Sequence, residues 1–144
     1  MKTLLTLTFI LLTVSIESFG HGEDKFGPNR GYLKMPGVFH TEVVPEKDGK
    51  IKIYLLDINF KSPMVKNSKV TATINNENKK ELNCTTQRDH FLCETTKADL
   101  IKGTLTIVAV RSTVKGAEAI YELPLTLAKP GTEMKKEEDH GSHH

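Results

Sequence analysis

The sequence has no tryptophan, few aromatic residues and only two cysteines. Its net charge of +2 is small, and lysines alternate with glutamates along most of the chain, so neither nucleic acid nor an acidic membrane surface is indicated as a partner. The sequence contains no Gly-x-Ser-x-Gly elbow for a nucleophile and no glycine-rich loop between a strand and a helix for phosphate. We therefore expect that the protein is not an enzyme.

Long apolar runs are also missing, apart from one near the amino terminus. Lys2 precedes an apolar run over residues 4–14, and the small residues Ser18 and Gly20 follow it, which predicts a secretory signal peptide over residues 1–20. The run has about eleven residues, whereas a membrane-spanning helix needs roughly twenty. We expect a periplasmic or secreted protein with no membrane insertion after cleavage.

The sequence does have valine, isoleucine and threonine in short segments separated by turn signals, a composition that favours strands. Such segments occupy residues 38–44, 50–60, 69–75, 82–86, 91–95, 104–111 and 117–127, and residues 98–102 could form one helical turn. Turns this frequent predict an all-β fold, an antiparallel immunoglobulin-like β-sandwich of about seven strands. The expected core includes Val70, Ala72, Ile74, Ile107, Ala109, Tyr121, Leu123 and Leu125.

The length left after removal of the signal peptide, about 124 residues, suits one domain. We expect a signal peptide at 1–20, an amino-terminal loop segment at 21–37, the β-sandwich domain at 38–128 and a disordered histidine-rich tail at 129–144. The histidines of the tail, His140, His143 and His144, are typical either of a tract that sequesters metal without a folded site or of the remains of a cloning tag.

The two cysteines flank a predicted hairpin that turns at Arg88 and Asp89. In that register Cys84 and Cys93 are directly opposed, which predicts a disulfide in an exported protein, with a contribution of about 2–3 kcal/mol to stability. The alternative is a pair of thiolate ligands for a soft metal. Strand alternation places the cysteines on a buried face and His90 on the opposite one.

Histidine and methionine form the remaining group of residues that could carry chemistry. Imidazole suits copper, zinc and nickel, and a thioether adds a preference for Cu(I), so the set predicts a copper ion, with zinc or nickel as alternatives. Each residue also has a structural interpretation, since a histidine in a strand is commonly a surface residue and a methionine commonly fills a gap. The candidate ligands are His21, Met35, His40, Met64 and His90, with the acidic residues Glu42 and Asp89 nearby in sequence.

His21 differs from the other histidines because cleavage after Gly20 would make it the first residue of the exported chain. Its α-amine, whose pKa is ordinarily near 8, would then lie next to its own imidazole, and the two nitrogens together can chelate Cu(II) in one plane. A second imidazole would complete the set of three nitrogens. We expect it from His40 or His90, with Met35 as an optional soft ligand.

Four segments resemble small periplasmic heavy-metal-associated domains: His21-Gly22-Glu23-Asp24, Gly27-Pro28-Asn29-Arg30-Gly31, Phe39-His40-Thr41-Glu42 and Ile53-Tyr54-Leu55-Leu56-Asp57. Those domains carry a Gly-Pro-Asn-Gly-Gly loop ahead of a His-x-Glu strand and accompany metal-efflux systems. Arg30 stands where that loop has a glycine.

In overall design the chain is also similar to CopC-type copper-resistance proteins, which have a signal, then a terminal histidine, then a β-sandwich. Their Cu(II) site uses the mature terminal histidine with a later histidine and aspartate. By this resemblance Asp89 and His90 would supply the later pair.

Together these features predict an exported protein that binds copper, or a related transition metal, for periplasmic storage, delivery or resistance, with a metal-efflux or envelope protein as a further partner. The alternative is a non-enzymatic protein-interaction module of the cell envelope, in which the histidines are incidental. A weaker third option is a small cell-envelope enzyme, which no residue pattern supports. A secreted eukaryotic origin also stays open, under which Asn83-Cys84-Thr85 would be a glycosylation sequon.

Overall fold

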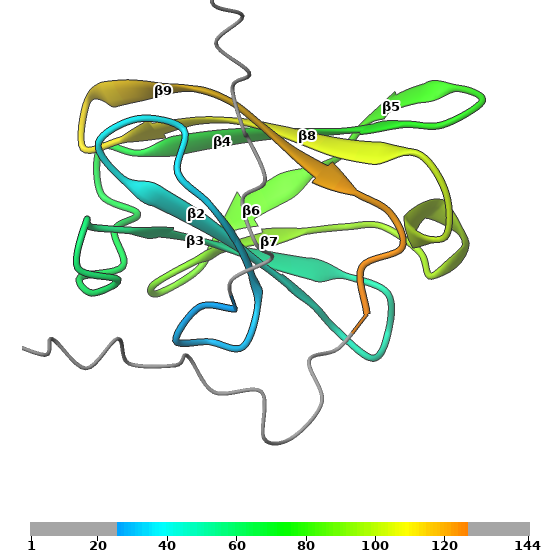
Figure 1. Ribbon diagram of the computed structural model, residues 1–144, viewed down its shortest axis with the longest axis horizontal. Helices are drawn as coiled ribbons and strands as arrows, with labels where there is room; N and C mark the ends of the chain where they lie inside the picture. Colours follow the sequence, from blue (N-terminus) through cyan, green and yellow to red (C-terminus); the bar gives the residue numbers. More distant parts are fainter. Residues whose placement is uncertain (1–25, 127–144) are drawn as a thin grey trace, which may run out of the picture.

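A computed structural model describes residues 26–126, which form two antiparallel sheets packed face to face (Figure 1). The predicted all-β sandwich is therefore confirmed. Our expectations for the signal peptide, for His21 and for the histidine-rich tail concern residues 1–25 and 127–144 and lie outside the described residues.

The first sheet has five strands in the order β1-β2-β3-β7-β6. Their bounds are Tyr32–Lys34 for β1, His40–Pro45 for β2, Ile51–Leu56 for β3, Phe91–Cys93 for β7 and Cys84–Thr86 for β6. The second sheet has four strands in the order β5-β4-β8-β9, with bounds Lys79–Glu81 for β5, Lys69–Asn75 for β4, Thr104–Arg111 for β8 and Val114–Glu122 for β9.

The strand pattern differs from the sequence-based expectation at the short elements. Strands β4 and β8 have the predicted bounds, and a 3-10 turn at Ala98–Leu100 stands where one helical turn was expected. Two three-residue strands were missed, β1 inside the expected loop segment and β5 in a run of exposed charged residues, so the described chain has nine strands. Strand β3 ends at Leu56 because a turn closes there, with the amide of Asp57 donating to the carbonyl of Lys61.

The core lies between the sheets and comes from alternate residues of the central strands, as period-2 patterning requires. Val43, Ile53 and Leu55 face Ala72 and Ile107, among others, and these side chains are fully buried. Within residues 26–126, no helix is long and apolar enough to cross a membrane.

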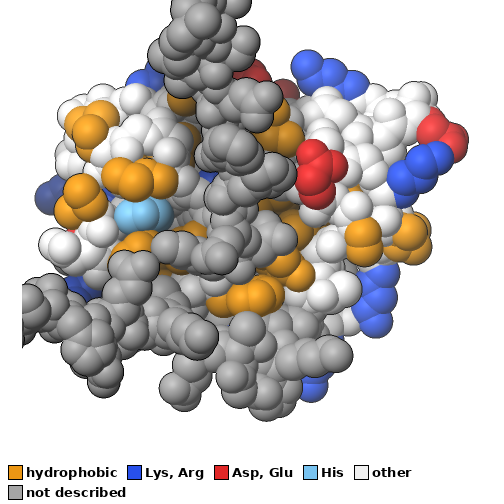
Figure 2. Space-filling model, in the orientation of Figure 1, with side chains coloured by type: hydrophobic (Ala, Val, Ile, Leu, Met, Phe, Trp, Pro, Cys, Tyr) orange, Lys and Arg blue, Asp and Glu red, His pale blue; other side chains and the backbone are white. Residues whose placement is uncertain are grey.

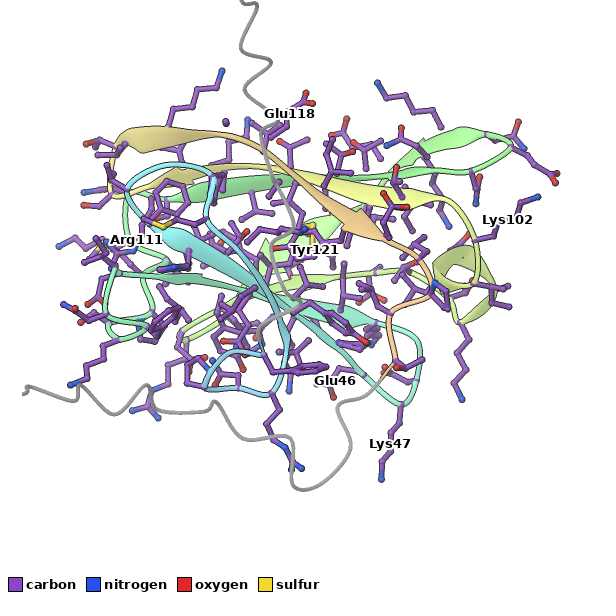
Figure 3. All side chains as sticks on the ribbon, viewed as in Figure 1. Glu46, Lys47, Lys102, Arg111, Glu118 and Tyr121 are labelled. Carbon is purple, nitrogen blue, oxygen red and sulfur yellow. A yellow bond between two sulfur atoms is a disulfide. The ribbon has the colours of Figure 1, made fainter. Side chains whose placement is uncertain are left out.

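Tyr121 joins the two sheets through a hydrogen bond in the core, and Figure 3 shows its side chain between the two layers. Its hydroxyl donates to the carbonyl of Thr41 on β2 over 2.9 Å. The Thr41 hydroxyl lies 2.6 Å from the phenol oxygen, in a second hydrogen bond between the same two residues. Burial raises the pKa of Tyr121, so the phenol keeps its proton and remains a donor.

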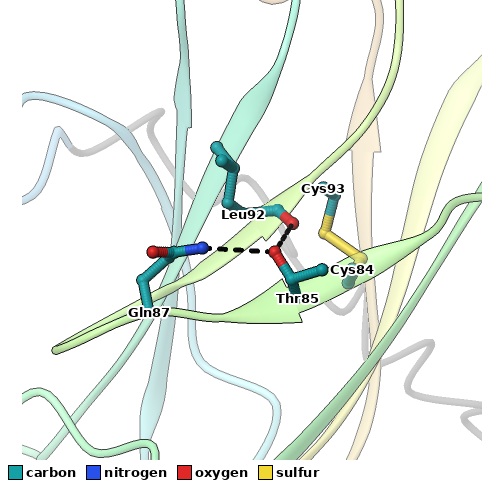
Figure 4. The surroundings of a disulfide bond; sticks show 5 residues. All are labelled: Cys84, Thr85, Gln87, Leu92 and Cys93. Atoms are coloured by element: carbon teal, nitrogen blue, oxygen red, sulfur yellow. Dashed lines mark hydrogen bonds between the residues drawn. A yellow bond between two sulfur atoms is a disulfide. The ribbon is translucent and has the colours of Figure 1, made fainter.

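The disulfide between Cys84 and Cys93 is confirmed, with the two residues directly opposed in the β6-β7 ladder (Figure 4). Beside it the Thr85 hydroxyl donates to the carbonyl of Leu92 and accepts a bond from the side-chain amide of Gln87. The alternative of two thiolate ligands is wrong, because both sulfurs are used in this bond and residues 26–126 contain no free cysteine.

Replacing Tyr121 by phenylalanine should lower the free energy of unfolding by about 1–3 kcal/mol, because the buried Thr41 hydroxyl and carbonyl lose their partner. Tyr32→Phe is the matched control, since its hydroxyl bonds to the backbone of Thr126 at an exposed position and its loss should cost less than about 1 kcal/mol. Urea unfolding curves measure both. Equal losses for the two variants would contradict the role assigned to Tyr121.

Candidate metal centre

The Gly-Pro-Asn loop and the His-x-Glu strand are joined by a buried carboxylate. Glu42 on β2 is fully buried, and it accepts three hydrogen bonds from the loop: from the amides of Asn29 and Gly31 at 2.8 Å each, and from the side-chain amide of Asn29 at 2.9 Å. Gly27 also packs here, since a Cβ at that position would lie 2.4 Å from the carboxyl carbon of Glu42. The loop therefore covers the outer face of the five-stranded sheet, where its blue trace lies in Figure 1.

Burial of Glu42 has an electrostatic consequence. Desolvation raises the pKa of this carboxyl above its ordinary value of 4.5, while the hydrogen bonds from Gly31 and Asn29 oppose the shift. All three bonds are donated by N–H groups and occupy three of the four lone-pair positions of this buried carboxylate, so Glu42 is a structural residue rather than a ligand. In the same loop Arg30 has φ 64°, a conformation that favours glycine.

His40 lies two residues before Glu42 at the start of β2, and only one of its two ring nitrogens, Nδ1, makes a hydrogen bond to the described residues. Its Nδ1 lies 3.1 Å from the carbonyl oxygen of Asp57, which can only accept, so Nδ1 carries the proton and Nε2 carries a lone pair. The side chain is 8% exposed. Its other ring nitrogen, Nε2, makes no hydrogen bond to any residue of the range 26–126.

The turn after β3 orients the His40 ring. The Asp57 carboxylate accepts bonds from the amides of Asn59 and Lys61, which hold its pKa below the ordinary value and close the turn. Phe60 is held there at φ 60° with its ring centroid 4.3 Å from that of His40. A histidine with Nδ1 bound to a carbonyl and Nε2 free is the arrangement that metal-ligating histidines adopt.

His90 lies just before β7 on the same outer face, but in a separate environment. Its Nδ1 is 2.7 Å from the Asp89 carboxylate, and its ring centroid lies 5.1 Å from that of Tyr54 on β3. Desolvation raises the pKa of Tyr54, so the phenol beside His90 is neutral. The predicted separation of His90 from the cysteines is confirmed, because Phe91 and Cys93 face the core while His90 does not.

The two methionines are placed differently from each other. Met35 is 51% exposed and follows Lys34, whose partner in the β1-β2 ladder is Thr41, the neighbour of His40. Met64 is half-buried, and its amide donates to the carbonyl of Leu55. Met35 is thus the methionine whose backbone lies next to the start of β2.

The candidate ligands do not form one cluster within the part of the chain that is described. Among residues 26–126, no three side chains of histidine, cysteine, aspartate or glutamate are grouped so that they could hold one ion. His40 is on β2 and His90 precedes β7, with β3 between these strands, so their Cα atoms are separated by two strand spacings, about 10 Å, before any offset along the strands. His40 and His90 are therefore separate single-imidazole positions.

Sequence reasoning did not identify the residues that orient the rings. Asp57 and Phe60 act on His40 from a turn that was expected to be strand, and Tyr54 packs on His90 through the β3-β7 ladder. The only local signal was the Asp57-Ile58-Asn59 sequence, since aspartate followed by asparagine is typical of a turn.

The sequence matches no known protein family, and neither the curated proteins nor the solved structures include a significant relative.

Glu42→Ala should lower the free energy of unfolding by about 2–3 kcal/mol, because the loop donors lose their acceptor. Glu42→Gln should cost less, because its carbonyl oxygen can accept both backbone bonds and Asn29 can turn its own amide to match the new one. Urea unfolding tests the order of the two variants. A glutamine variant no more stable than the alanine variant would contradict the hydrogen-bonded role of this carboxylate.

The raised pKa of Glu42 predicts a pH dependence with a definite sign. A folded-state pKa above the unfolded value contributes stability that is complete below the unfolded value, 4.5, and is lost as the pH rises through the folded value. The unfolding free energy of the wild type minus that of Glu42→Gln should therefore decrease as the pH rises from 4.5. Denaturation of both proteins across this range measures it, and an increasing difference would show that the ionised carboxylate is the favoured form.

Proposed function

We propose that the protein binds copper, or a related transition metal such as zinc or nickel, outside the cytoplasm, for storage, delivery or resistance. The observation that carries this proposal is His40, whose Nδ1 donates to the Asp57 carbonyl and whose Nε2 makes no hydrogen bond to residues 26–126. The disulfide fits an extracytoplasmic location, since such bonds persist in oxidising compartments. A periplasmic or secreted location is part of the proposal.

One imidazole is not a complete site, and His21 is proposed to supply the remaining nitrogens. The described chain begins at Phe26, which pairs with Tyr32 at the β1 edge of the five-stranded sheet. Five extended residues span at most about 17 Å, so the backbone of His21 would lie within that distance of Phe26. The α-amine and imidazole of His21, with Nε2 of His40, would give three nitrogen ligands for Cu(II).

The strand order favours His40 over His90 as the partner of His21. Starting from Phe26, β2 is two strand spacings away, about 10 Å, whereas β7 is four spacings away, about 19 Å. The second distance exceeds the backbone reach of five residues. We therefore assign His90 and Asp89 to a separate position, and keep Met35, which lies on the His21 side of β2, as an optional soft ligand for Cu(I).

A copper titration of the processed protein tests the assignment, with its amino terminus determined by mass spectrometry. Tail variants with His140, His143 and His144 replaced by alanine remove a competing tract. In that background His40→Gln and His21→Ala should each weaken Cu(II) binding by about tenfold or more, the lower bound set by the loss of an outer-shell partner.

His90→Gln is the matched control and should leave the Cu(II) affinity unchanged. The proposal fails if the processed chain begins elsewhere than at His21, or if the affinity survives replacement of His40. Loss of binding on replacement of His90 alone would move the site to the Asp89–His90 position.

A second candidate function is protein interaction at the end of the sandwich that carries the loop between β1 and β2. Met35 and Val38 are exposed there, and the loop is fixed to β9 by a hydrogen bond from the amide of Ala117 to the carbonyl of Pro36. Hydrophobic side chains gather around a surface histidine on the face shown in Figure 2. Under this function Val38→Ser would abolish recognition by an envelope protein while copper binding persisted.

A further inference from the structure

Strand β1 lies at one edge of its sheet, at one end of the order β1-β2-β3-β7-β6. Within residues 26–126, only Phe26 pairs with it on the side away from β2, through a single bridge to Tyr32. An edge strand presents unpaired N–H and C=O groups, which favours pairing with any further extended segment that lies alongside. Among residues 26–126, Leu33 and Lys34 therefore have no strand partner on the side away from β2.

The turn before β1 determines which backbone groups of this strand point away from β2. Gly27 donates to the carbonyl of Gly31 over 2.8 Å, so the Gly31 carbonyl points away from β2. Successive residues of a strand direct their backbone groups to opposite edges, so Leu33, two residues after Gly31, directs its N–H and C=O to the same side as Gly31 does. The hydrogen bonds that the amides of Asn29 and Gly31 donate to the Glu42 carboxylate hold this turn in place.

We propose that the segment preceding Phe26, residues 21–25, adds a strand to the free edge of β1 in antiparallel register. The bridge of Phe26 with Tyr32 sets the register, so Lys25 is opposite Leu33 and Asp24 is opposite Lys34. The segment is long enough for this pairing. Lys25 and Asp24 would pair with the rest of β1, and residues 21–23 would extend beyond it towards the loop at Met35.

The charges of the paired residues support this register. Lys34 makes no ion pair with any residue of the described range, and the pairing would place the Asp24 carboxylate directly across from it. Oppositely charged cross-strand neighbours stabilise a sheet, whereas a shift of the register by one residue would place Lys25 across from Lys34. The pairing needs no metal, so it goes beyond the proposed function while delivering His21 to the side of the sheet where β2 begins.

Amide hydrogen exchange of the full chain as isolated, without added metal, tests the pairing. The Leu33 amide should be protected, and Lys25→Pro should accelerate its exchange by about tenfold or more, because proline removes one bond of the Lys25–Leu33 pair and distorts the other. Asp24→Pro is the matched control. The backbone groups of Asp24 point away from β1 in this register and only its charge pairing with Lys34 is lost, so exchange of the Leu33 amide should accelerate clearly less than in Lys25→Pro.

Deletion of residues 21–25 provides a second variant if the proline substitution prevents folding, and amides of β4 and β8 report that the core is intact. Equal exchange of Leu33 in the wild type, the Lys25→Pro variant and the deletion would overturn the proposal. Protection that persists in the deletion and grows with protein concentration would also overturn it, by identifying a second copy of the chain as the occupant. If the wild-type protein shows a protected Leu33 amide but does not bind copper, the metal proposal alone would be overturned.

Discussion

The buried carboxylate of Glu42 is the constraint on which the amino-terminal half of this fold depends. It lies in the middle of β2, and its three hydrogen bonds fix the loop from Gly27 to Gly31 over the outer face of the sheet. Because that loop is fixed, the chain must enter at the outer edge of β1, next to Tyr32. A carboxylate that is neither exposed nor ion-paired thus determines where the preceding segment can go.

The two halves of the His-x-Glu sequence therefore have different roles. Successive strand residues alternate in direction, so His40 and Glu42 share the outer face, while Thr41 turns inward to meet Tyr121. Glu42 is covered by the loop before β1, and His40 is supported by the turn after β3, with Phe60 against its ring. The loop before β1, the turn after β3 and Tyr121 thus all contact the three residues from His40 to Glu42. In the ring of His40, only Nδ1 is bonded to a residue of the described range.

Much of the architecture could be predicted from the sequence, because alternation and turn chemistry act locally. The ladder residues of β4 and β8 and the opposition of Cys84 with Cys93 follow from period-2 patterning and hairpin symmetry. Strand β1 could not be predicted, because three residues with a lysine carry no period of their own and are strand only through pairing with β2. The contact of His40 with Asp57 likewise spans 17 positions, and only the register of β2 with β3 brings the two together.

The position of the disulfide has a chemical consequence for any metal held near His40. The sheet order puts the Cys84–Cys93 bond on the two strands at one edge, β6 and β7, and puts β1 at the other edge. Reduction would release two thiols on the far side of the sheet from β1, beneath a core face rather than beside the imidazole. The cysteine sulfurs and the His40 imidazole are thus kept at least two strand spacings apart, so a metal held at His40 would not meet the cysteines whatever their redox state.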